Sequence, residues 1–210
     1  MNIGFTGQTD YKMDYAGYAV TGNTKIDAFY SGLSSAVERA DGKGEGKILG
    51  LTMLPYSDTL SYGMTAKYSE KSTEDDPVIR ISSNYGGEQR YYDVHVNEVD
   101  PTNASQLEMF ALSCYMDDKG ITDGGSFGSY SKMKVYTQNS AYDGLCPDMQ
   151  DPANISIKFD WVSILKQMAQ AYLGNAKTYS QYLSADGLAK SLEMWSQKFN
   201  TYFGGLENEY

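Results

Sequence analysis

Length, composition and charge set the first limits. The chain has 210 residues, which suits one domain with appendages, and its hydrophobic share of 41% is enough for a core. The net charge of −10 and the lack of a basic stripe argue against nucleic acid and a polybasic membrane-surface role, because both need clustered Lys and Arg. No stretch approaches the roughly 20 apolar residues of a transmembrane span.

The N-terminal part is the least regular. Residues 1–22 are rich in Gly, Tyr, Thr and Asp without a period and carry no signal-peptide pattern. They predict a flexible arm on a protein that is cytoplasmic or is exported without a recognisable signal. Asn23 or Thr24 can cap a helix that runs to Arg39, and the glycines of 41–46 form a connection. The expected divisions are an arm at 1–22, a single α+β domain at 23–205 and an acidic tail at 206–210.

Four segments of β-type sequence predict an antiparallel sheet, since consecutive strands can join through short hairpins. The second segment alternates polar and apolar residues, and Gly86-Gly87 supplies the turn between the third and fourth. A charged loop at 70–76 separates the two hairpins. The four segments are 47–54, 60–69, 78–82 and 92–96.

The second hairpin has two distinct faces, because successive strand residues point to opposite sides of a sheet. The face expected to meet the core carries Ile79 and Ile81 opposite Tyr92, Val94 and Val96. The outer face carries Arg80, Asp93, His95 and Asn97.

The helix after this sheet has start and stop signals. Asn103 with Gln106, or Ser105 with Glu108, fits a capping box, and Gly120 stands where a C′ glycine ends a helix after Lys119. The side expected to face the core carries Leu107, Phe110, Ala111, Cys114 and Tyr115.

Further helices fill the rest of the chain. One begins at Ser126, one is capped by Asp160 and ends at Gly174, and the last ends after Phe203. Their expected buried residues include Tyr130, Met133 and Tyr136, then Trp161, Ile164 and Leu165, then Leu188, Leu192, Trp195 and Phe199. Alternation at 155–159 predicts a short fifth strand. The fold class is therefore α+β, an antiparallel sheet of about four strands followed by and packed on about three to five helices.

His95 and Asp93 mark a candidate surface site on the outer face. A lone histidine can act as a general base or metal ligand, but it is also an ordinary exposed residue of a sheet. One histidine and two cysteines argue against a structural zinc site, which needs four such ligands. No dinucleotide, P-loop or serine-hydrolase motif occurs, so no cofactor is predicted.

The two cysteines leave alternatives open. Cys114 can be a nucleophile that works with His95, but its place on an apolar stripe favours a core role. Cys146 lies in a loop expected to be exposed, and a disulfide between the two is a further possibility.

A cluster of acids suggests a metal loop. Asp117, Asp118 and Asp123 stand near two adjacent glycines, but their spacing does not match an EF-hand. Helix termination at Gly120 explains the same residues, so these acids are metal candidates that compete with a capping role.

The 19 tyrosines are the unusual feature of the composition. Exposed tyrosines can form a surface that binds protein or glycan, because the ring stacks and the hydroxyl forms hydrogen bonds. The alternative is that tyrosine replaces leucine and phenylalanine in the core.

The stretch from Tyr92 to Leu112, followed by Asp117-Asp118-Lys119-Gly120 and Phe127-Gly128, resembles uncharacterised proteins of Gram-positive, gut-type anaerobic bacteria. The resemblance covers about a quarter of the chain. It implies a bacterial origin and a lineage-specific accessory protein, and it assigns no activity or catalytic residue.

These observations favour a non-catalytic bacterial accessory protein or protein-interaction domain, without nucleic acid or a transmembrane segment. Two alternatives remain. One is a secreted or surface glycan-binding module, and the other is a carboxylate-dependent hydrolase or exported effector.

Overall fold

The computed structural model describes residues 12–13, 19–20, 47–55, 61–84, 89–124, 128–142, 144–174 and 176–203. The chain divides into two units, residues 1–45 and 46–210. In the first unit, strands β1 (Lys12–Met13) and β2 (Ala19–Val20) pair antiparallel within the segment predicted to be an arm. The predicted helix from Asn23 to Arg39, the connection at 41–46 and the tail at 206–210 lie outside the described residues.

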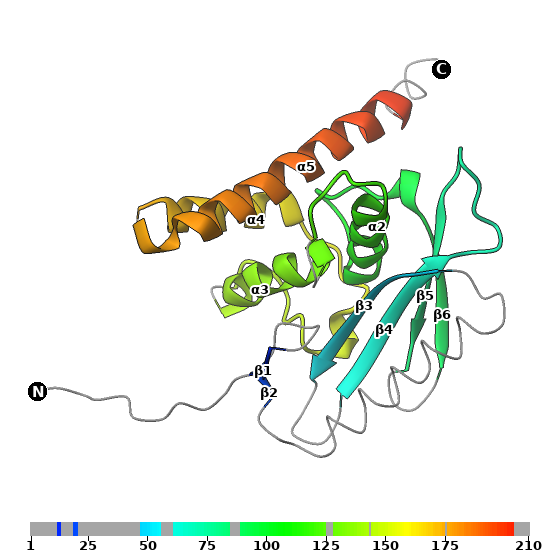
Figure 1. The fold of residues 1–210 in the computed structure, drawn as a ribbon, viewed down its shortest axis with the longest axis horizontal. Coiled ribbons are helices and arrows are strands. Elements are labelled where there is room, and N and C mark those ends of the chain that lie inside the picture. The colour runs from blue at the N-terminus through cyan, green and yellow to red at the C-terminus, as the bar shows by residue number, and fades with distance from the viewer. Residues whose placement is uncertain are drawn as a thin grey trace, which may run out of the picture. The chain divides into compact units, whose positions relative to one another are not determined.

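The second unit is α+β, as predicted: an antiparallel sheet followed by helices that pack on it (Figure 1). The strands lie in chain order, β3 (Ile48–Pro55), β4 (Ser61–Tyr68), β5 (Val78–Ser83) and β6 (Arg90–His95). The α-helices are α2 (Gln106–Asp118), α3 (Gly128–Tyr142), α4 (Trp161–Leu173) and α5 (Tyr179–Phe203). Short 3-10 helices are η2 (Val96–Glu98), η4 (Pro152–Asn154) and η5 (Ala176–Thr178).

The register of β5 and β6 confirms the predicted faces. Ile79 pairs with Val94 and Ile81 pairs with Tyr92, and both isoleucines are fully buried. Val96 is also fully buried, but it begins η2 and does not extend the strand, so the predicted end of this strand was one residue too long. The buried face of the sheet is the one that α2 contacts.

Helix α2 lies so close to β3 that a side chain cannot fit between them at one point. A Cβ atom on Gly50 would lie 2.3 Å from Sγ of Cys114 and 3.6 Å from the ring of Phe110. Cys114 and Phe110 are buried, and burial continues around most of the helix. The core role predicted for Cys114 is therefore confirmed, and α2 is the central helix of the unit.

Both ends of α2 are built by local hydrogen bonds. Ser105 accepts from the backbone N–H of Glu108, and the carboxylate of Glu108 accepts from the backbone N–H of Ser105, which completes a capping box. The alternative cap at Asn103 is wrong, because its N–H donates to the carbonyl of Asp100 and it precedes the first helical turn. At the other end Gly120 has a φ of +67°, as its predicted C′ position requires.

The predicted fifth strand at 155–159 is wrong. Asp151 accepts from the N–H of Ala153 and starts the 3-10 turn of η4 at Pro152, so the chain turns where a strand would have to begin. One β-bridge remains, from Phe159 to Ala104. The ring of Phe159 stacks on Trp161 at 4.6 Å, so the segment contributes to the aromatic part of the core.

Helices α4 and α5 form a hairpin beside α2 and α3 (Figure 1). Asp160 caps α4 and Gly174 is its C-cap, as predicted. Trp161, Leu188 and Leu192 are buried, and Trp195 of α5 meets Tyr115 of α2 at 5.9 Å between ring centroids. Because α5 has 25 residues and α4 has 13, the C-terminal part of α5 extends past its partner (Figure 1).

Helix α3 begins at Gly128, and Ser126, its predicted start, lies outside the described residues. Its predicted face is confirmed at Tyr130, Met133 and Tyr136, which are all buried.

Candidate functional site

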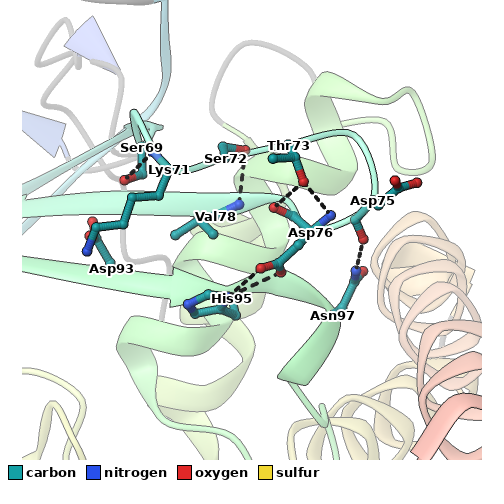
Figure 2. Close-up of polar contacts among 10 residues, drawn as sticks. All are labelled: Ser69, Lys71, Ser72, Thr73, Asp75, Asp76, Val78, Asp93, His95 and Asn97. Atoms are coloured by element: carbon teal, nitrogen blue, oxygen red, sulfur yellow. Dashed lines mark hydrogen bonds and ion pairs between the residues drawn. The ribbon is translucent and has the colours of Figure 1, made fainter.

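His95 lies on the outer face of β6, as predicted, where the loop between β4 and β5 folds against it (Figure 2). Its Nδ1 is 2.9 Å from Oδ2 of Asp76, and the other ring nitrogen points away from that carboxylate. The loop is fixed on both sides of the pair, because Asp76 N–H donates to Thr73 Oγ1 at 2.9 Å and Asn97 Nδ2 donates to Asp75 O at 2.8 Å. His95 and Asp76 are 42% and 52% exposed, so their interaction is a surface pair.

Asp93 lies on the same face as His95 but has different partners. Arg80 donates to both of its oxygens, at 2.8 and 2.9 Å, and Lys71 Nζ lies 3.4 Å away. The hydrogen bonds from Arg80 lower the pKa of Asp93 to about 2. Asp93 is therefore an ionised member of a cross-strand ion pair and a poor general base near neutral pH.

The structure does not bring His95 and Cys114 together. Cys114 packs against Gly50 on the buried face of the sheet, whereas His95 lies on the opposite face. Burial, together with the nearby Asp117, raises the pKa of the Cys114 thiol, which keeps it protonated and unreactive. The predicted alternative of a nucleophile that works with His95 is therefore wrong.

Both cysteines are free, so the alternative of a Cys114–Cys146 disulfide is also wrong. Cys146 is half-buried, although it was expected to be exposed. Its thiol donates to the carbonyl of Thr137 at 3.2 Å, and burial raises its pKa to about 11.

The acids at the end of α2 are separated by their partners. Asp117 accepts from the N–H and Oγ of Ser129 at 2.8 and 2.5 Å and from Oγ1 of Thr122, so it holds the first turn of α3. Asp118 accepts from Nζ of Lys47 at 2.6 Å and from the hydroxyl of Tyr68 at 2.9 Å. These contacts, those with Lys47 first, lower the pKa of Asp118.

Asp123 contributes differently, because its backbone carbonyl accepts from Lys132 at 2.7 Å. Within the part of the chain that the structure describes, no group of three or more His, Cys, Asp or Glu side chains is placed to hold a metal ion. Asp117 joins α2 to α3 through Ser129, and Asp118 joins α2 to β4 through Tyr68.

Lys134 is a chemically unusual residue that the sequence analysis missed. It is 1% exposed in α3, and its Nζ donates to the carbonyl of Met53 at 2.8 Å. Burial lowers its pKa to about 7, so the amine changes charge near neutral pH. The available signal was its position four residues after Tyr130, on the face predicted to be buried. The contact joins α3 to strand β3.

Large apolar side chains that are exposed gather on the α4–α5 hairpin. Four of the nine among the described residues are there: Leu173, Tyr179, Leu183 and Met194, with exposures of 54%, 51%, 52% and 66%. At 3.6 residues per turn, the three on α5 fall within an arc of about 60°. We call Tyr179, Leu183 and Met194 the α5 stripe.

The α5 stripe lies opposite the residues that attach α5 to the core. Ala185, Leu188, Ala189 and Leu192 are buried and occupy the other side of the helix. The ring of Tyr179 rests against Tyr182 at 5.6 Å, which holds it on the helix surface. The buried apolar period of α5 was predicted from the sequence, but the exposed one was not.

A scan against protein-family models and searches of curated proteins and solved structures return no match to this chain. None of the helices among the described residues is both long and apolar enough to cross a membrane.

Proposed function

We propose that this chain is a non-catalytic protein-interaction domain and that the α5 stripe is its partner-binding surface. The observation that carries the proposal is the exposure of Tyr179, Leu183 and Met194, at 51%, 52% and 66%, on one side of a helix whose other side packs into the core. Exposed apolar patches mark surfaces that another molecule covers more often than single exposed residues do, and these three side chains share one side of the helix. The buried side already accounts for the attachment of α5, so the stripe is available for binding.

The contacts of the candidate chemical residues support a scaffold role. Asp117 caps α3, Asp118 binds Lys47 and Tyr68, and Asp93 binds Arg80. Each of these side chains is engaged in joining elements of the fold. Both tryptophans also pack internally, because Trp161 is fully buried and the indole N–H of Trp195 donates to Val99 O. A glycan-binding face would therefore have to use tyrosine or phenylalanine rings.

Site-specific photo-crosslinking in cells that naturally express the chain tests this function. Benzoylphenylalanine at Tyr179 keeps an aromatic ring on the α5 stripe, and the same group at Gln170 on the exposed side of α4 is the matched control. We expect a discrete protein adduct at Tyr179 that is absent at Gln170. Identical adduct patterns at the two positions would contradict the proposal.

A further inference from the structure

We infer that the partner of the α5 stripe is a second copy of this chain, with the two α5 helices packed antiparallel about a two-fold axis beside Gly187. The inference rests on the proposed function and names its partner. A two-fold interface must be self-complementary, because residue i of one copy meets residue j of the other and j meets i. The exposed side of α5 meets this condition in its spacing, its charges and its central glycine.

The spacing is symmetric about the point between Asp186 and Gly187. Tyr179 and Met194 are equally far from that point along the chain, and so are Leu183 and Lys190. In an antiparallel pair, Tyr179 therefore meets Met194 of the partner subunit twice, once at each end. Contacts between a methionine sulfur and an aromatic ring are favourable. Leu183 meets the aliphatic part of Lys190 of the partner subunit in the same way.

The charges between the apolar residues are also self-complementary. Asp186 and Lys190 pair within one helix at 2.7 Å, and their side chains are 28% and 68% exposed. In the antiparallel arrangement, each Asp186 comes within about one helical turn of Lys190 of the partner subunit. The net charge of −10 opposes association of whole chains, but within this strip Asp186 is balanced by Lys190, and Glu193 is paired with Lys166 of α4.

No contact that the structure describes within the chain explains why a glycine stands at position 187. It lies within a 25-residue helix, is exposed, and a Cβ atom added to it would meet nothing within 4 Å. Glycine costs about 1 kcal/mol relative to alanine inside a helix. Where two helices cross, a residue without a side chain lets the backbones approach closely. Gly187 stands at the point where the proposed pair would cross.

The expected interface is small. The stripe runs over 16 residues, or about 22 Å of helix, and a single helix pair of this length buries less than the roughly 1,200 Å² of a standard interface. The dimer should therefore be weak and depend on concentration. Helix α4 borders one edge of this surface, because its Lys166 pairs with Glu193 of α5, so the partner helix has to pack from the opposite edge.

Sedimentation velocity of the full chain, from micromolar to near-millimolar concentration, measures the association. We expect reversible dimers. We also expect Leu183→Gln and Gly187→Gln to weaken the association, so that the dissociation constant rises by about tenfold or more. The matched control is Val135→Gln on α3, which is also exposed, at 48%, and should leave the dimer unchanged. Thermal unfolding at low concentration checks that the stripe variants fold.

Disulfide trapping tests the orientation in a Cys146→Ser background. An equal mixture of Tyr179→Cys and Met194→Cys chains should give mixed dimers, with Gln170→Cys as the control that stays monomeric. Dimers of Tyr179→Cys alone would indicate a parallel pair and overturn the arrangement.

A chain that stays monomeric at every concentration would overturn this inference. If the crosslinker at Tyr179 then still captured a different protein, the proposed function would stand and only the identity of the partner would be wrong. If it captured nothing, both would be wrong.

Discussion

Helices α2 and α5 both carry many apolar residues. Contacts within the chain account for the apolar residues of α2 but not for all those of α5. Around α2 the apolar side chains meet the sheet or neighbouring helices, and its ends are closed by a capping box and a C′ glycine. Helix α5 buries one side in the core and leaves Tyr179, Leu183 and Met194 exposed on the other. The difference separates apolar residues that stabilise the monomer from those that are available to a partner.

Truncation of a core ring should give the largest stability effect. Phe110→Ala removes a ring that is 1% exposed and should lower the free energy of unfolding by about 3–5 kcal/mol. Leu183→Ala on the α5 stripe should change it by less than about 0.5 kcal/mol. Urea denaturation at low protein concentration measures both, and equal losses would remove the distinction between the two helices.

The buried amine of Lys134 makes stability depend on pH. Its pKa of about 7 in the folded state lies below the unfolded value of about 10.4, so between these values the unfolded state binds more protons. Stability must therefore rise with pH across this window. From pH 6 to pH 9 the native chain should gain about 2–3 kcal/mol relative to Lys134→Met.

Parallel denaturation curves of the two proteins measure this difference, and other titrating groups cancel in the comparison. Equal pH dependence would show that the folded state does not lower the affinity of Lys134 for its proton.

Removal of the α2 cap should cost less. Ser105→Ala deletes the acceptor for the N–H of Glu108 and should reduce stability by about 1 kcal/mol. Asn103→Ala is the control, because the backbone N–H that contacts Asp100 is retained. If the two changes lower stability equally in thermal unfolding, Ser105 is not the residue that caps α2.

A change at Gly187 should have a small effect of the opposite sign. Gly187→Ala should stabilise the monomer by about 0.5–1 kcal/mol, because alanine favours helix and a Cβ atom meets open space. Gly120→Ala should instead destabilise it, since Gly120 has a φ of +67°. A loss of monomer stability at Gly187 would mean that the glycine is required by its own chain.

Much of the fold could be predicted because local signals agreed with the final contacts. Period-two alternation identified β4 and the two faces of β5 and β6, and Asp160, Gly120 and Gly174 marked helix ends. Errors arose where two local solutions fitted equally. Asn103 and Ser105 both matched a cap, and the alternation at 155–159 did not reveal that the turn at Pro152 leaves only a single bridge to Ala104.

The candidate site was harder to predict for physical reasons. Lys134 reaches the carbonyl of Met53, a residue distant in sequence, through a long side chain whose position no local pattern reveals. Helix α5 carries two apolar periods: the one that faces the core was predicted, as Leu188 and Leu192 show, but the exposed one was not. His95 and Asp93 attracted notice as rare or charged residues, but their partners are the loop acid Asp76 and the neighbouring Arg80.

Hydroxyl-radical footprinting across protein concentrations tests whether the α5 stripe binds a second copy of this chain. We expect the oxidation of Met194 and Leu183 to fall as concentration rises, while that of Tyr91, a residue of β6 that is 64% exposed, stays constant. If Met194 and Leu183 react at the same rate at every concentration, with Tyr91 as the reference, the α5 stripe does not bind a second copy of this chain.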